Sequence, residues 1–378
     1  MTTDKYSFIA EWYDDEAALT KTFQLSYFLE DNTIELYELK TRRLFLKRIQ
    51  VPTVNLGDMY IGSTLYILSR NMRILDFANE FTRSSLGKFM EVTFAMLKPE
   101  ALDRCGEILD FIMKNKFIIA KMKMVCMEKS HILDFYREHV DKAFMGFLLD
   151  HLTSPCLAMK LVGKDAAARW REVIGPTDPE KARKESPDSL RACFGKDIQH
   201  NIVQGSQSQE DAKRELEMFF PTCEERIMVA PRTSALLENT TLCLVKPHAV
   251  RDGLLGLILS EILRKNFQIT AMQMFNMVRA GAEEFYEVYN GVVPEFVDMV
   301  NELLLGPCVA IELIHPDGDT HTKFRELTGP RDPEVAKELE PDSLRAKFGW
   351  SKVHNAVHCT DLPEDCASEV GYFFVVLQ

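Results

Sequence analysis

Through most of the chain, short segments with the pattern of a β-strand alternate with short segments that have the three- to four-residue spacing of a helix. TFAMLK (93–98) is a short apolar run, and FIIAKMKMVCM (117–127) alternates apolar and polar residues, which predicts β-strands. GEILDFIMKN (106–115) and HILDFYREHV (131–140) carry apolar residues three or four positions apart, as on one face of a helix. PCLAMKLV (155–162) predicts a further strand. Strands and helices interleaved at this spacing predict an α+β sandwich of the ferredoxin-like kind.

The first 92 residues have a different pattern. YFLEDNTIELYE predicts a β-hairpin that turns at Asp31-Asn32, and LYILSRNMRILDF predicts another that turns at Arg70-Asn71. Neither segment has a counterpart further along the chain. We therefore predict a small β-rich domain over residues 1–92.

The remainder contains an internal repeat. PDSLRACFG at 187–195 returns as PDSLRAKFG at 341–349, and SPCLAMKL at 154–161 returns as GPCVAIEL at 306–313. The separation is about 150 residues and drifts slightly along the chain, which indicates a duplicated globular domain with small loop insertions. The predicted boundaries are 93–221 for a first module, 222–238 for a linker without clear periodicity, and 239–378 for a second module.

Composition excludes several classes of protein. Hydrophobic residues make up 46% of the 378 residues, enough for packed cores. The net charge of −12 argues against nucleic acid as a partner. No apolar run reaches the roughly 18 residues that span a membrane, and the N-terminus lacks a secretory pattern. Nine cysteines, an odd number without a C-x-x-C pair, favour reduced thiols in the cytoplasm.

The second copy contains a set of residues suited to phosphoryl transfer. His358 is a possible nucleophile, and Glu369 follows eleven residues later. An imidazole can attack phosphorus through one ring nitrogen while a carboxylate holds the other. A lone histidine is more often structural, but cations and a phenol accompany this one. These residues are Lys246, Tyr286, Arg325 and Arg345.

The motifs of this copy resemble the nucleoside diphosphate kinase family. An N-x-x-H-x-[ST] sequence follows S-L-R-A-x-F-G, and an upstream strand ends in V-K-P. The resemblance implies that a histidine takes the γ-phosphate of a nucleoside triphosphate and passes it to a diphosphate, with Mg²⁺ on the phosphates. It implies that His358 is phosphorylated, that Glu369 orients it, and that Asn355 contacts the ribose. The implied phosphate-binding residues are Lys246, Tyr286, Arg325 and Arg345.

The first copy lacks the histidine. Gln204 stands in its place, and an amide has no basic nitrogen with which to accept a phosphoryl group. His200 comes too early in the motif, as does its counterpart His354, and is predicted to be a structural or surface residue. The other residues of the family pattern are Lys98, Tyr136, Phe144, Arg171, Thr177, Arg191, Asn201 and Glu215. The first module is therefore predicted to bind nucleotide without turning it over.

The second copy departs from the family pattern at three other positions. Pro294 replaces the phenylalanine that stacks on the base, with Phe296 two residues later. Arg331 replaces a phosphate-contacting threonine, and His248 replaces the aspartate after Lys-Pro. A weaker base clamp is implied. Arg331 would either contact the phosphates or face solvent, and the sequence supports both equally.

The N-terminal segment resembles the DM-ten domain of ciliary proteins through FIAEWYD, TRRLFLKR, LGDMYIG and LYILSRNMRILDF. A DM-ten domain followed by two kinase modules resembles the ciliary, type-seven branch of the family. This resemblance implies a cytoskeletal protein of the axoneme in cilia or flagella, with tubulin and other axonemal proteins as partners. KTRRLFLKR (40–48) would either meet acidic tubulin or keep a strand edge solvated.

Two hypotheses of function remain open at this level. Either the second module is a working nucleoside diphosphate kinase, or both modules are structural units inside a ciliary microtubule with vestigial nucleotide sites. His358 and Glu369 favour the first, and Gln204 and Pro294 favour the second. Because members of the family pair edge to edge, we also predict that the two modules pack on each other as a pseudo-dimer.

Overall fold

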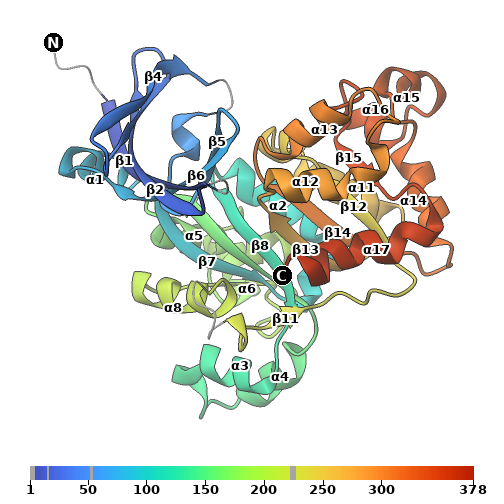
Figure 1. Cartoon of the computed structure of the whole chain (residues 1–378). Helices are drawn as coiled ribbons and strands as arrows, with labels where there is room; N and C mark the ends of the chain where they lie inside the picture. The colour runs from blue at the N-terminus through green and yellow to red at the C-terminus, as the bar shows by residue number, and fades with distance from the viewer. Residues whose placement is uncertain (1–4, 15–16, 52–53, 222–226) are drawn as a thin grey trace.

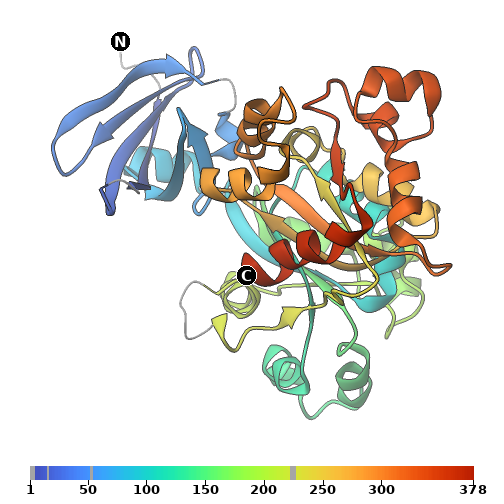
Figure 2. The ribbon, with the colours of Figure 1, turned by 45° about the vertical axis from the view of Figure 1, so that its right-hand side comes forward.

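The computed structural model describes residues 5–14, 17–51, 54–221 and 227–378. These residues form two sheets, a six-stranded one from the N-terminal segment and a nine-stranded one shared by the two modules. The six-stranded sheet lies to one side of the larger sheet in both views (Figures 1 and 2). Within the described residues, no helix has the length and apolar character needed to cross a membrane.

The N-terminal domain is an antiparallel sheet with the strand order β4-β3-β2-β1-β6-β5. Its core contains Phe8, Phe23, Leu25 and Met59, all without solvent exposure. The elements are β1 (Lys5–Asp14), β2 (Leu19–Phe28), β3 (Thr33–Glu38), β4 (Arg43–Gln50), η1 (Leu56–Asp58), β5 (Thr64–Ile67), β6 (Arg70–Phe77) and α1 (Glu80–Leu86).

The second hairpin turns two residues earlier than the sequence predicts. Ile67 pairs with Arg70, so the turn residues are Leu68 and Ser69 rather than Arg70 and Asn71. Both turn residues have positive φ, at 44° and 67°, as a tight hairpin turn requires. The prediction placed the turn on Asn71 because asparagine tolerates that conformation. Asn71 instead lies in β6 and donates a hydrogen bond to the Met277 carbonyl of the second module.

The first module alternates strands and helices, as its hydrophobic pattern predicts. Its elements are β7 (Glu91–Leu97), η2 (Pro99–Arg104), α2 (Cys105–Lys114), β8 (Ile118–Cys126), α3 (Lys129–Phe135), η3 (Arg137–His139), α4 (Met145–His151), β9 (Cys156–Gly163), α5 (Ala166–Ile174), α6 (Pro179–Glu185), α7 (Leu190–Phe194), β10 (Val203–Gly205) and α8 (Gln209–Phe219).

The second module repeats this order of elements. Its elements are β12 (Thr241–Val245), α10 (Pro247–Arg251), α11 (Leu255–Arg264), β13 (Gln268–Phe275), α12 (Arg279–Phe285), η4 (Glu287–Tyr289), α13 (Phe296–Leu303), β14 (Cys308–Ile314), α14 (Thr320–Thr328), α15 (Pro333–Leu339), α16 (Leu344–Phe348), β15 (Val357–Cys359), η5 (Pro363–Asp365), α17 (Cys366–Gly371) and the π-helical turn η6 (Tyr372–Val376).

The two modules join edge to edge, which confirms the predicted pseudo-dimer. The strand order β10-β7-β9-β8-β13-β14-β12-β15 is symmetric about the β8–β13 pair, where Lys123 faces Gln273. Helices α2 and α11 cross where Gly106 and Gly256 bring their backbones together. A Cβ on Gly106 would lie 2.5 Å from the Ser260 nitrogen. Because a single hydrophobic core spans both modules, they form one folded body.

The predicted linker is built into the sheet rather than free of it. Residues 222–226 lie outside the described residues, but β11 (Arg232–Thr233) pairs with β8 of the first module. Downstream, the backbone N–H groups of Leu236 and Leu237 donate to the buried Glu312 carboxylate. This connection is therefore fixed to both modules.

Candidate functional site

Both copies hold the residue before the catalytic strand in the same unusual backbone conformation. Ile202 and Ala356 have φ of 63° and 68°, in the left-handed region that is costly for residues with a side chain. The carbonyl of each accepts a hydrogen bond from the backbone N–H of the Lys-Pro lysine, Lys98 or Lys246, at 2.9 Å. The strained residue thus ties the end of the catalytic strand to the lysine.

An acid–histidine pair supports this turn in each copy, half-buried in the first copy and buried in the second, with its two members exchanged. In the first copy Glu100 follows Lys-Pro, and its Oε2 lies 2.6 Å from His151 Nε2. In the second copy His248 follows Lys-Pro, and its Nδ1 lies 2.7 Å from Glu302 Oε1. The His248 departure from the family pattern is therefore compensated by Glu302. Glu100 accepts the Ile202 N–H, and His248 Nε2 accepts the corresponding N–H.

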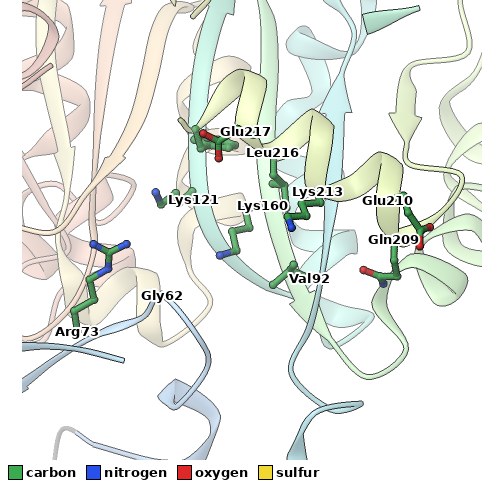
Figure 3. Close-up of a pocket in the computed structure, with 11 residues that line it drawn as sticks. Gly62, Arg73, Val92, Lys121, Lys160, Gln209, Glu210, Lys213, Leu216 and Glu217 are labelled. Carbon is green, nitrogen blue, oxygen red and sulfur yellow. The ribbon is translucent and has the colours of Figure 1, made fainter. Parts of the chain in front are cut away.

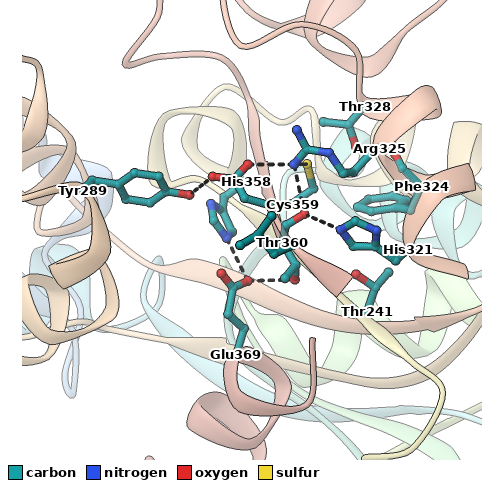
Figure 4. A network of polar contacts seen from close by, with 12 residues as sticks. Thr241, Tyr289, His321, Phe324, Arg325, Thr328, His358, Cys359, Thr360 and Glu369 are labelled. Atoms are coloured by element: carbon teal, nitrogen blue, oxygen red, sulfur yellow. Dashed lines mark hydrogen bonds and ion pairs between the residues drawn. The ribbon is translucent and has the colours of Figure 1, made fainter. Parts of the chain in front are cut away.

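His358 of the second module is held at one ring nitrogen. It lies on β15, and its Nε2 is 2.9 Å from Glu369 Oε2 on α17 (Figure 4). Thr360 donates a second hydrogen bond to the same carboxylate oxygen. Phe285 covers the imidazole in an edge-on contact with ring centroids 5.1 Å apart. With Nε2–H donating to Glu369, Nδ1 keeps its lone pair.

Buried polar groups surround His358. Lys246 Nζ donates to the Val353 carbonyl, and burial lowers the pKa of Lys246 to about 8. Arg345 donates to the Gly329 carbonyl. The Tyr286 hydroxyl and Asn355 Oδ1 are buried and have no hydrogen-bond partner among the described residues. Unmade hydrogen bonds of this kind are costly, and they mark a place where a polar ligand would be stabilised.

A chain of contacts links three residues that line the second site, Tyr289, Asp361 and Arg325. Tyr289 donates to Asp361 at 2.5 Å, and Asp361 forms an ion pair with Arg325 at 2.7 Å (Figure 4). Burial alone would raise the pKa of Asp361, but the hydrogen bonds from Tyr289 and Arg325 outweigh it and hold the pKa below its usual value. The cavity is only about 120 Å³. Sequence analysis missed Asp361 and Tyr289, although Asp361 stands three residues after His358.

The structure also places the other residues at which the second copy departs from the family pattern. Arg331 lines the cavity, its side chain is 37% exposed, and it pairs with Glu295 at 3.2 Å. Phe296 packs against the module's core as the first residue of α13. Neither Pro294 nor Phe296 lines the cavity, whose aromatic lining residues are Tyr286 and Tyr289.

The first module has an open cavity of about 490 Å³ at the equivalent place. It brings together every predicted binding residue of this copy, namely Lys98, Tyr136, Phe144, Arg171, Thr177, Arg191 and Asn201. Lys98 Nζ donates to Asn201 Oδ1 at 2.7 Å, and burial lowers the pKa of Lys98 to about 8. The Tyr136 hydroxyl and Arg191 Nε are buried without a partner.

The absent histidine leaves a different polar arrangement in the first module. Gln204 lines the cavity, and its amide donates to the Gly205 carbonyl. Glu215, the equivalent of Glu369, accepts from the Ser206 hydroxyl at 2.5 Å. Burial raises the pKa of Glu215 to about 7. His200 is half-buried beside Asp197, as expected of a structural residue.

The fold is a tandem of two related α+β modules, and each module has a polar cavity at the equivalent place. A profile of the nucleoside diphosphate kinase family matches residues 91–225 and 239–377, and one of the DM10 domain matches residues 2–82. The chain belongs to the nucleoside diphosphate kinase family.

Curated relatives share the whole arrangement. The chain is 44% identical to "nucleoside diphosphate kinase homolog 7" of Rattus norvegicus, over 99% of this chain and 94% of the rat protein. Its identity to the Mus musculus protein of the same name is 43%, with the same coverage. The solved nucleoside diphosphate kinase of Aquifex aeolicus is 38% identical over 34% of this chain and 92% of its own, with a TM-score of 0.33.

Proposed function

We propose that the second module transfers the γ-phosphate of nucleoside triphosphates to nucleoside diphosphates through a phosphohistidine at His358. The observation that carries this proposal is the contact of His358 Nε2 with Glu369, which leaves Nδ1 as the nucleophile beside buried phosphate-binding groups. Nδ1 forms a bond to the γ-phosphorus while the bond to the β–γ bridging oxygen breaks and the diphosphate leaves. The acceptor's terminal oxygen then attacks the same phosphorus and releases Nδ1.

The other residues of the site bind and stabilise charge. Lys246 and Arg345 would neutralise the phosphate oxygens, and the Tyr286 hydroxyl would donate to one of them. Glu369 would stabilise the positive charge that develops on the imidazole. Mg²⁺ would enter with the nucleotide and spread the charge of its phosphates. Within the described residues, no three His, Cys, Asp or Glu side chains are grouped as a metal site.

The second site must open before it can act. A cavity of about 120 Å³ is well below the roughly 300 Å³ at which ligand sites begin. Phosphate would compete with Asp361 for Arg325, and release of Asp361 would also free Tyr289. Nucleotide binding is therefore coupled to breaking this ion pair.

Incubation of the full chain with γ-labelled ATP and Mg²⁺ tests the activity. Acid-labile label should appear on the protein and should be discharged by added nucleoside diphosphate. His358→Ala should remove the label, and His354→Ala should retain it. Equal labelling of the parent and His358→Ala would refute the assignment and favour the alternative of a structural protein with vestigial sites.

We further propose that the first module binds a nucleoside di- or triphosphate without consuming it. Its cavity is already open, and Arg171 at its mouth makes no ion pair within the described residues. Phe144 is exposed at the rim, where a base could stack on it. Calorimetry of the His358→Ala chain with ADP and Mg²⁺ should show binding that Arg171→Met weakens. No heat at millimolar ADP would contradict this.

The order of the domains and the basic surface of β4 support a proposal about where the protein is located. We propose that the protein is attached to axonemal microtubules of cilia or flagella through the N-terminal domain. β4 is an exposed edge strand, and its Arg43 and Lys47 make no ion pair within the described residues, which suits the acidic surface of tubulin. In co-sedimentation, microtubules should bind the parent chain more strongly than a chain with Arg43→Glu and Lys47→Glu. Unchanged binding would exclude this surface.

A further inference from the structure

A second kind of polar cavity lies where the N-terminal domain meets the first module. Its volume is about 600 Å³, and it shares no lining residue with either nucleotide site. Four cationic side chains line it, from β6, β8, β9 and α8 (Figure 3). They are Arg73, Lys121, Lys160 and Lys213. The charged ends of Arg73, Lys121 and Lys160 border a common space (Figure 3).

Across the part of the chain that the structure describes, carboxylates neutralise these cations only in part, through Glu217 near Lys121 and Glu11 near Arg73. Within the described residues, neither Lys121 nor Lys160 lies within ion-pair distance of a carboxylate, and Arg73 reaches Glu11 only at 3.9 Å. Two carboxylates, Glu210 and Glu217, also line the cavity on the α8 side. The lining therefore carries more positive than negative charge, in a chain whose net charge is −12.

Holding these groups together is costly without an anion. Burial, and then repulsion from Lys121 and Arg73, lowers the pKa of Lys160 to about 8. Lys160 Nζ lies 3.5 Å from the position that a Cβ would take on Gly62, so the lysine reaches across to the N-terminal domain. Such mutual repulsion would be relieved by a bound anion.

We propose that this cavity binds a small anion with two or more phosphate groups, held by Lys121 and Lys160 of the first module and Arg73 of the N-terminal domain. The cations converge on one space rather than lining an extended track, which suits a compact polyanion better than an acidic peptide. Lysine offers point charges and arginine a two-pronged donor for phosphate oxygens. Val92, Leu216 and Phe220 give the cavity an apolar side that would pack against the rest of the ligand.

Because of where the cavity lies, a bound ligand would also hold the N-terminal domain against the first module. Because Arg73 belongs to the N-terminal sheet and both lysines belong to the nine-stranded sheet, a bound anion bridges the two bodies. Its binding energy would add to the direct contacts between the domains, such as the Tyr66 hydroxyl with Arg279. The inference does not depend on the proposed kinase activity.

Inorganic tripolyphosphate is the probe for this site. Arg171→Met and Arg325→Met first weaken the two nucleotide sites, and tripolyphosphate is then titrated by calorimetry, without Mg²⁺, into this full chain, which serves as the parent for the comparison. We expect one site per chain, weakened at least about tenfold by Lys160→Met and by Arg73→Met. Lys123→Met is the matched control, because Lys123 lies two residues from Lys121 on β8 but does not line the cavity. It should bind as the parent does.

Melting of the ligand-free chains separates lost binding from lost folding. Lys160→Met should melt at or above the temperature of the parent, because it removes a cation that its neighbours repel. Equal affinity of the parent and Lys160→Met, or no heat at millimolar tripolyphosphate, would overturn the proposal. Tighter binding of a hexaglutamate peptide than of tripolyphosphate would also overturn it, in favour of an acidic protein segment.

Discussion

The two modules divide the properties of one active site between them. The first has the open cavity, the exposed Phe144 and the free Arg171, but it has Gln204 in place of a nucleophile. The second has His358 oriented by Glu369, but its cavity is closed by the Arg325–Asp361 ion pair. The features proposed for nucleotide binding and the residue proposed to react with the nucleotide are therefore unequally shared between the two modules.

The shared backbone shows how this divergence was possible. The left-handed residue before the catalytic strand is retained in both copies, and so is the acid–histidine pair that supports it. That pair has even exchanged its members, from Glu100 and His151 to His248 and Glu302. In either order, one member of the pair accepts the backbone N–H of the left-handed residue. The nucleophile, by contrast, is required only for chemistry.

The largest effect should come from making the second site like the first. His358→Gln should lower phosphoryl transfer by on the order of 10³-fold or more, because no other imidazole lies beside Glu369. The rate is measured with γ-labelled ATP and an acceptor diphosphate. His321→Gln is the control, since His321 contacts only the backbone carbonyl of Thr360 from outside the cavity. Transfer that survives His358→Gln would place the activity elsewhere.

The reverse exchange tests whether the first site has lost only its nucleophile. In the His358→Gln background, Gln204→His should restore acid-labile label, at a rate up to about a hundredfold below that of the parent. Gln204 pairs with Met96 in the same way that His358 pairs with Leu244, so the new ring starts from an equivalent backbone position. Glu215 would receive its N–H. If nucleotide binds but no label forms, the first site has also lost the geometry for transfer.

Opening the second site should have a smaller effect. Asp361→Asn removes the charge that holds Arg325, so ADP should bind this module about tenfold more tightly. Thermal shift with ADP and Mg²⁺ in the Arg171→Met background isolates the second module. Asp317→Asn is the control, because it removes an exposed ion pair with Lys323 outside the cavity. Unchanged affinity would mean that the ion pair does not limit binding.

The sequence predicted what depends on local pattern. Alternation in 117–127 identified β8, and helical spacing in 106–115 identified α2, because each segment buries one face. The motif around His358 predicted a cluster of side chains that the fold brings together. Comparison of the two copies could have found half of the exchanged pair, since Glu100 aligns with His248; at the separation of 152 residues that relates 154–161 to 306–313, His151 lies one position after the counterpart of Glu302.

The sequence could not predict features set by tertiary geometry. Asp361 could pair with several cations, and only the folded loop selects Arg325. The pairing of β11 with β8 depends on where the sheet edge of the first module lies, not on the two residues of β11. The basic cavity at Lys160 escaped notice because its cations come from four separate elements.

The smallest expected effect is a pH dependence of binding in the first module. Lys98 has a pKa of about 8 in the folded protein, lowered by burial, and it must carry a proton to bind phosphate. ADP affinity of the His358→Gln chain should therefore fall about threefold between pH 7.5 and 8.5.

The stability of the ligand-free chain should change in the opposite direction. Above pH 8 the unfolded lysine holds a proton that folded Lys98 has released, so this group favours folding more as pH rises. Lys98→Met should remove both trends. A pH-independent affinity in the parent would mean that phosphate binding in this module does not use Lys98.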